Sequence, residues 1–187
     1  MSYPTVHILR QPFLNIIASA VEPFKHECIG RFFGRKPTKR HNRFLITNAF
    51  PVSCVATRGN KEIRISTRSE KRLVDLFSSA SSLWPFLGEF HSHTEWGKIV
   101  RDMRLSSHDI EDTISKKMPL NIVVVISSRK RGRSHWVALS DGSVKGSLSK
   151  YNFHIGAFIL VDEEPVMLKI VSPKALKALN REHSKSA

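Results

Sequence analysis

The chain is 187 residues long, a length that predicts one domain. Hydrophobic residues make up 41% of it and charged residues 25%, and this composition excludes a wholly disordered protein. Lys and Arg number 30 against 16 Asp and Glu, and the net charge of +14 excludes an acidic solvating protein and points to an anionic partner.

Hydrophobic periodicity predicts strands and helices in the first half of the chain. The expected elements are a strand at 6–8, a helix that Pro23 limits, strands at 27–34, 43–50 and 62–67, and a second helix that Ser69 caps. The apolar stripes of the helices are Phe13, Ile16, Ile17, Ala20 and Phe24 in the first and Leu73, Leu76, Phe77 and Ala80 in the second.

The second half of the chain is richer in strands. The expected elements are extended structure at 86–91, a helix from Ser106 or Ser107 to about Lys117, a buried central strand at 121–126, further strands at 136–139, 153–160 and 166–171, and a short basic helix from Pro173 that frays after Asn180. This order predicts one α/β or α+β domain at 1–172, with a mixed sheet flanked by helices, and a basic tail at 173–187.

The expected cellular compartment follows from the transmembrane and signal segments that are not found in the sequence. No apolar run reaches the ~20 residues that a transmembrane helix needs, and we expect no membrane partner. The N-terminal segment lacks the layout of a secretory signal, so we expect a cytoplasmic protein. Cys28 and Cys54 allow one disulfide at most, which excludes a disulfide scaffold and predicts two buried thiols.

The chemistry of the chain is concentrated in a pair of histidines at the end of a predicted strand. His91 and His93 are two residues apart, so both imidazoles point to the same side of the strand. Neutral imidazole suits zinc, and Asp109, at the start of a predicted helix, offers a third ligand. Three protein ligands leave a fourth position for water, which is the arrangement of a catalytic zinc site.

The residues around this pair form a longer pattern. In chain order they are Glu27-x-x-Gly30-x-x-x-Gly34, then Gly88, then His91-Ser92-His93, then Ser106-x-x-Asp109. This pattern resembles the JAMM (MPN+, JAB) metalloprotease family across most of the chain. Two features depart from the family: Thr94 stands where it usually has Pro, and the interval 94–105 is longer than usual, which we interpret as a lengthened loop on the substrate side.

The resemblance implies a single MPN-like domain with a curved mixed sheet of cytidine-deaminase-like architecture. It also implies that His91, His93 and Asp109 bind one catalytic zinc, that Glu27 is the general base, and that Ser106 donates a hydrogen bond to the oxyanion. The implied activity is that of a peptidase or isopeptidase that cleaves the amide after the C-terminal Gly of a ubiquitin-like protein. A catalytically silent scaffold of the same fold and a nucleic-acid-binding module are the alternatives.

Four residues near this pattern have other expected roles. Asp102 is an alternative metal ligand, and His108 is a surface residue at the start of a helix. Glu89 is expected beside the site. Trp96 either faces the substrate or covers the core of its own loop.

Positive charge is concentrated in two predicted loops. They contain Arg31, Arg35, Lys36, Lys39 and Arg40 in the first and Arg129, Lys130, Arg131 and Arg133 in the second. Such loops track phosphates, bind an acidic protein, or only increase solubility. Few aromatic residues lie among these cations, which argues against a platform that stacks single-stranded bases.

Overall fold

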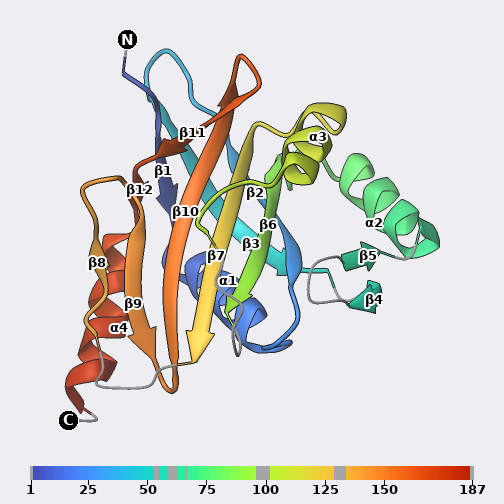
Figure 1. Ribbon diagram of the computed structural model, residues 1–187. Coiled ribbons are helices and arrows are strands. Elements are labelled where there is room, and N and C mark those ends of the chain that lie inside the picture. The colour runs from blue at the N-terminus through green and yellow to red at the C-terminus, as the bar shows by residue number, and fades with distance from the viewer. Residues whose placement is uncertain are drawn as a thin grey trace.

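The computed structural model describes residues 2–52, 55–58, 63–65, 67–95, 102–128 and 134–185, and Figure 1 shows their arrangement. The elements in chain order are β1 (Thr5–Ile8), α1 (Arg10–Val21), β2 (Ile29–Arg35), β3 (Arg43–Pro51), β4 (Val55–Arg58), β5 (Ile63–Ile65), α2 (Thr67–Ser79), β6 (Phe86–Glu95), α3 (Ser107–Ser115), β7 (Leu120–Ser128), β8 (Val137–Ala138), β9 (Val144–Leu148), β10 (Tyr151–Val161), β11 (Glu164–Leu168), β12 (Ile170–Val171) and α4 (Pro173–Lys185).

One mixed sheet organises the described part of the chain. Its order is β12-β1-β3-β2-β6-β7-β10-β9-β8, and β11 pairs with β10 beyond the end of β9. The pairs β1–β12, β1–β3 and β6–β7 are parallel, and the others are antiparallel. Strands β4 and β5 form a separate antiparallel ribbon. The predicted α+β class with a mixed sheet is confirmed.

The central strand β7 shows how the two faces of this sheet differ. Side chains alternate along a strand, so Ile122 and Val124 point to one face and Val123 and Val125 to the other. The first pair belongs to the main core, which α1 and α4 cover. The second pair belongs to a smaller cluster that includes Leu105 and lies on the side of α3. The sheet is therefore buried on both faces at its centre.

Some predicted elements differ from the observed ones. Helix α2 already begins at Thr67, so the predicted N-cap Ser69 is wrong and lies in the first turn of the helix. The strand predicted at 166–171 is two strands, because β11 pairs with β10 whereas β12 pairs with β1 at the other end of the sheet. Strand β9 was not predicted because Gly146 interrupts its apolar pattern, leaving room for the ring of Trp136.

The C-terminal segment is part of the core and not a frayed tail. Helix α4 continues past Asn180 to Lys185, and its Ala175 and Leu179 are buried in the main core. The side chain of Asn180 accepts a hydrogen bond from the N–H of Trp136 at 2.7 Å and donates one to its carbonyl at 3.0 Å. These contacts attach the helix to the sheet, so the boundary expected at residue 172 divides one packed unit.

Helix α2 lies beside the sheet (Figure 1), and only part of its predicted apolar stripe is covered. The ring of Phe77 packs on Phe33 of β2 with 4.4 Å between centroids, and on Trp84 with 5.9 Å. By contrast, Leu76 is 51% exposed. No helix in the described ranges has the length and apolar character needed to cross a membrane.

Gly88 of β6 gives a test of this packing. Its φ is +154°, and a Cβ at this position would overlap the carbonyl oxygen of Leu120 on β7. We expect Gly88→Ala to lower the free energy of unfolding by about 3 kcal/mol, because the backbone of two central strands must separate. Urea unfolding measures the change. Lys177→Ala, on the exposed side of α4, is the control, and equal stabilities of the two variants would contradict the prediction.

Candidate metal centre

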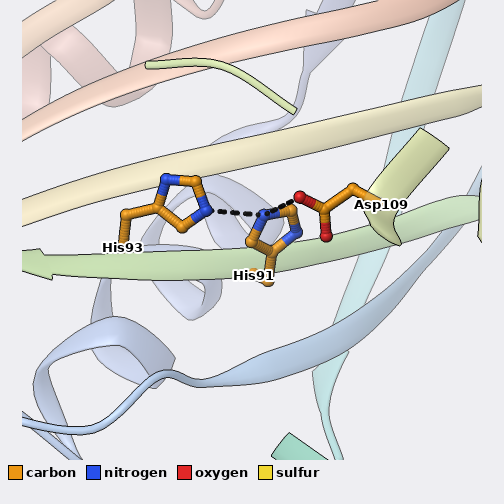
Figure 2. Close-up of side chains that lie close together, drawn as sticks. All are labelled: His91, His93 and Asp109. Carbon is orange, nitrogen blue, oxygen red and sulfur yellow. Dashed lines mark hydrogen bonds and ion pairs between the residues drawn. The ribbon is translucent and has the colours of Figure 1, made fainter. Parts of the chain in front are cut away.

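Strand β6 places two imidazoles next to each other on the side of the sheet that faces α3. His91 and His93 are two residues apart, and their Nε2 atoms are separated by 3.1 Å. Figure 2 shows the two rings side by side, with Asp109 next to His91. The predicted geometry of the histidine pair is therefore present in the structure.

Asp109 reaches the histidines from the first turn of α3. Ser106 is the N-cap of this helix, and the helix begins with a capping box. Asp109 Oδ2 accepts hydrogen bonds from the backbone N–H and from the hydroxyl of Ser106, both at 2.7 Å. The same Oδ2 lies 3.6 Å from His91 Nε2. The cap thus orients the carboxylate toward the histidine pair.

The three side chains have the spacing of a metal site. Their ligand atoms all lie within 4.8 Å of one another, and no other such group of three is found among the described residues. Zinc binds nitrogen at 2.0–2.1 Å in a tetrahedron, which requires ligand atoms about 3.3 Å apart. The separations of 3.1 and 3.6 Å lie on either side of this value.

Hydrogen bonds from outside the cluster hold these ligands in place. His93 Nδ1 lies 3.0 Å from the carbonyl of Asp102, and because a carbonyl only accepts, Nδ1 is the donor of this bond, which leaves Nε2 of a neutral imidazole as the nitrogen with a lone pair for a metal. Thr113 donates to the carbonyl of Asp109 at 2.6 Å, and buried Asn121 of β7 donates to Thr113 at 2.9 Å. This chain ties the first turn of α3 to the sheet.

The protonation states at neutral pH suit a metal. Burial lowers the pKa of His91 to about 4, although the charge of Asp109 opposes the shift. Burial raises the pKa of Asp109, but His91 and the two hydrogen bonds from Ser106 outweigh it, so this pKa lies below its ordinary value. His91 is therefore neutral and Asp109 ionised near pH 7, as metal ligands must be.

The cluster opens into a cavity of about 350 Å³ that Glu27 also borders. Glu27 precedes β2, and hydrogen bonds to β6 fix the residues on either side of it. The Cys28 N–H donates to Ser92 Oγ at 2.8 Å, and the Ser92 N–H donates to the Cys28 carbonyl at 3.0 Å. Thr94 Oγ1 donates to the His26 carbonyl at 3.2 Å. Thr94, unlike the proline usual in the JAMM family, supplies this second link.

A buried ion pair lies at the same cavity. Arg31 Nε donates to Glu89 Oε1 at 3.2 Å, and both side chains are only 7% exposed. Lys116 Nζ approaches the other oxygen of Glu89 at 3.5 Å. The expectation that Arg31 belongs to a surface patch is wrong, because β2 turns it inward opposite Glu89 of β6. Glu89 lies beside the site, as expected.

The other predicted site residues have mixed outcomes. Ser106 borders the cavity, but its hydroxyl is engaged with Asp109, so its role as oxyanion donor stays a prediction. Asp102 contacts His93 through its backbone carbonyl, and its carboxylate is not part of the candidate metal cluster of His91, His93 and Asp109. His108 borders the cavity. Trp96, Cys54 and the basic residues at 129–133 lie outside the described ranges.

The sequence did not indicate the supporting roles of Thr113, Asn121 and Arg31. Thr113 lies four residues after Asp109, a spacing at which a hydroxyl reaches the carbonyl one turn earlier, and this was the available signal. The contacts of Asn121 with Thr113 and of Arg31 with Glu89 depend on how α3 and the strands pack.

The protonation of His91 predicts how the metal-free protein responds to pH. Unfolded His91 takes up a proton near pH 6.5, whereas the folded protein resists it down to about pH 4. The unfolded state binds more protons across this interval, so stability falls as the pH drops from about 6.5 to about 4. His91→Asn should make this loss smaller by roughly 2 kcal/mol.

Urea unfolding in a chelator at several pH values measures this effect. His7 and His154 also have lowered pKa values, but both remain in the two proteins and cancel in the difference. Parallel stability curves for the wild type and His91→Asn would contradict the assignment.

Comparison with known proteins adds information about the fold. No family model and no curated protein matches this sequence. Among 127 matching chains of solved structures is the solution structure of protein DSY2949 from Desulfitobacterium hafniense, which is 15% identical. The similarity covers 90% of this chain and 92% of that chain, with a TM-score of 0.52. The chain is therefore similar to that protein in fold, and at this identity no activity is inferred from the similarity.

Proposed function

We propose that this chain is a zinc-dependent metallopeptidase of the JAMM type. The observation that carries the proposal is the convergence of His91, His93 and Asp109 on one point of a cavity that Glu27 also borders. The residues of the family pattern come from three separate segments of the chain, and the fold brings them together around one cavity. A packing role alone does not require that convergence.

The donor set favours zinc. Two neutral imidazoles and one carboxylate suit a borderline-soft divalent ion in a tetrahedral site. The described lining of the cavity is also rich in carboxylates. It includes Glu27, Glu89, Asp102, Asp109 and Asp112 and the cation Arg104, while Arg31 and Lys116 pair with Glu89. A lining with this many carboxylates suits a divalent cation.

The chain's own residues then have distinct tasks. Zinc, when bound, polarises the scissile carbonyl and lowers the pKa of water to about 7. Glu27 accepts a proton from the attacking water and passes it to the leaving amine. The hydrogen bonds of Cys28 and His26 to β6 fix the backbone of Glu27 at the edge of the cavity, which keeps its carboxylate within the site for proton transfer.

The remaining parts of the proposal depend on the resemblance. Ser106 would donate to the oxyanion of the tetrahedral intermediate, and its place on the cavity supports this role. The hydroxyl must first leave Asp109, to which it donates in the structure. We propose a ubiquitin-like protein as the substrate, with cleavage after its C-terminal Gly. The MPN-like, cytidine-deaminase-like classification of the domain is part of the same proposal.

The metal is the first test. Purified protein should contain about one zinc per chain by elemental analysis. His91→Ala and Asp109→Ala should lose it, because two ligands do not retain the ion through purification. His108→Ala is the matched control, since His108 borders the cavity but lies outside the cluster. Wild-type protein without zinc, or equal zinc content in all variants, would rule out the metal centre.

The base is the second test. Glu27→Gln should retain zinc and lower the rate of cleavage of a ubiquitin-like fusion by about 10²- to 10⁴-fold, because the amide accepts no proton. Glu163→Gln, in the exposed turn between β10 and β11, is the control and should cleave normally. Zinc binding without cleavage by the wild type, across ubiquitin-like and ordinary peptide substrates, would instead support the silent scaffold.

A further inference from the structure

The turn between β2 and β3 presents four cations at one end of the sheet. Arg35, Lys36, Lys39 and Arg40 are all exposed. The turn is well defined, because the N–H of Thr38 and that of His41 each donate to the other residue's carbonyl, at 2.9 and 3.1 Å. The positive charges therefore occupy a folded hairpin and not an irregular loop.

These charges have no counterions among the residues that the structure describes. None of the four forms an ion pair or a side-chain hydrogen bond with a described residue, and no acidic residue occurs in the sequence between Glu27 and Glu62. Arg31, on the same strand, is instead buried against Glu89. Of the cations on β2 and its hairpin, those at the hairpin end thus remain available to an anionic partner, whereas Arg31 does not.

The neighbouring strands extend the patch. Arg43 of β3 pairs with Thr5 of β1, and Val6 pairs with Ile170, so exposed Lys169 lies on the other side of Thr5. Adjacent strands are ~4.8 Å apart, so the cations at the ends of β2 and β3 and Lys169 before β12, with β1 between β3 and β12, span about 14 Å. The acidic turn at 162–164 lies at the other end of β11, and the strand between this turn and Lys169 is about 16 Å long. This distance exceeds the Debye length of about 8 Å, so salt screens the attraction between the acidic turn and Lys169.

An aromatic side chain lies beside these cations. Tyr3 is 55% exposed. Residues on either side of it are bonded to Asn42 at the base of the hairpin: Asn42 Nδ2 donates to the carbonyl of the preceding Ser2 at 3.1 Å, and the N–H of Thr5, two residues after Tyr3, donates to the Asn42 carbonyl at 3.2 Å. The fold therefore adds the ring that the basic segment itself lacks.

We propose that this surface, formed by the β2–β3 hairpin, Arg43, Lys169 and Tyr3, binds single-stranded nucleic acid. The cations contact successive phosphates, and the ring of Tyr3 stacks on a base. An acidic protein fits less well, because a protein interface needs a larger apolar centre than one tyrosine supplies. The surface is separate from the metal cavity, since the eight residues from Glu27 to Arg35 span about 26 Å of extended chain.

The test measures binding of a fluorescent mixed-sequence oligonucleotide of about 20 nucleotides to the full chain by anisotropy. The hairpin variant carries Arg35→Gln, Lys36→Gln, Lys39→Gln and Arg40→Gln. Its control replaces four exposed cations elsewhere with glutamine and has the same net charge: Lys150, Lys174, Lys177 and Arg181. Circular dichroism and thermal unfolding show that each variant is folded.

Six phosphate contacts, four from the hairpin and one each from Arg43 and Lys169, predict that wild-type affinity falls about 300-fold between 50 and 200 mM salt. The hairpin variant should lose most of this salt dependence and bind at least about tenfold more weakly at 100 mM salt, while the control variant keeps both properties. Tyr3→Ala should weaken binding by about five- to 100-fold, and Tyr3→Phe should restore it because phenylalanine also stacks.

Three results would overturn the proposal. Equal losses in the hairpin and control variants would mean that net charge alone attracts the oligonucleotide. Unchanged binding by Tyr3→Ala, or tighter binding of the matching duplex, would exclude the single-stranded mode. Displacement of the oligonucleotide by an equal charge concentration of polyglutamate would indicate an acidic protein partner. Zinc content and peptidase activity do not enter these measurements, so the proposal stands or fails apart from the proposed function.

Discussion

The position of β6 between β2 and β7 is the constraint on which the candidate site depends. Antiparallel pairing with β2 sets Ile29 opposite His91, and parallel pairing with β7 sets Val123 on the other side. A slip of one residue in either register would turn both histidines into the main core and Phe90 toward α3. The burial of Phe90, Ser92 and Thr94 on the opposite face of β6 therefore also orients the imidazoles.

The same strand connects the packing to the electrostatics of the cavity. Ser92, on the face opposite the histidines, is buried and bonded to Cys28, which places Glu27 at the rim. Glu89 pairs with Arg31 across the β2–β6 contact. Buried charges are costly unless they are paired, and Asp109 satisfies its carboxylate through the cap of α3. The charged side chains of Arg31, Glu89 and Asp109 are thus positioned by the pairing of β2 with β6 and by the cap of α3.

Sequence reasoning was reliable where residues act through local geometry. The spacing of His91 and His93, a serine cap at 106 or 107 and the buried strand β7 follow from the period of a strand or the chemistry of a helix start. The structure shows the histidine spacing and the buried strand, and Ser106 is the cap. Sequence reasoning failed where contacts between segments far apart in the chain decide whether a residue is buried or which strand it pairs with. Arg31 reads as a surface cation because its partner lies 58 residues away. The exposure of Leu76 and the role of β12 depend on which surfaces remain after the sheet is assembled.

By itself, the sequence determined a single α+β domain, an excess of positive charge and a set of ligand types whose order predicts a zinc site. Each of these depends on residue type or on short spacing along the chain. The tertiary structure decided which charges are neutralised, because ion pairs form between strands that lie far apart in sequence. It buried Arg31, left the hairpin cations exposed, and brought Tyr3 beside them. Part of the net charge of +14 thus lies on an exposed surface away from the cavity, whose described lining holds more carboxylates than cations.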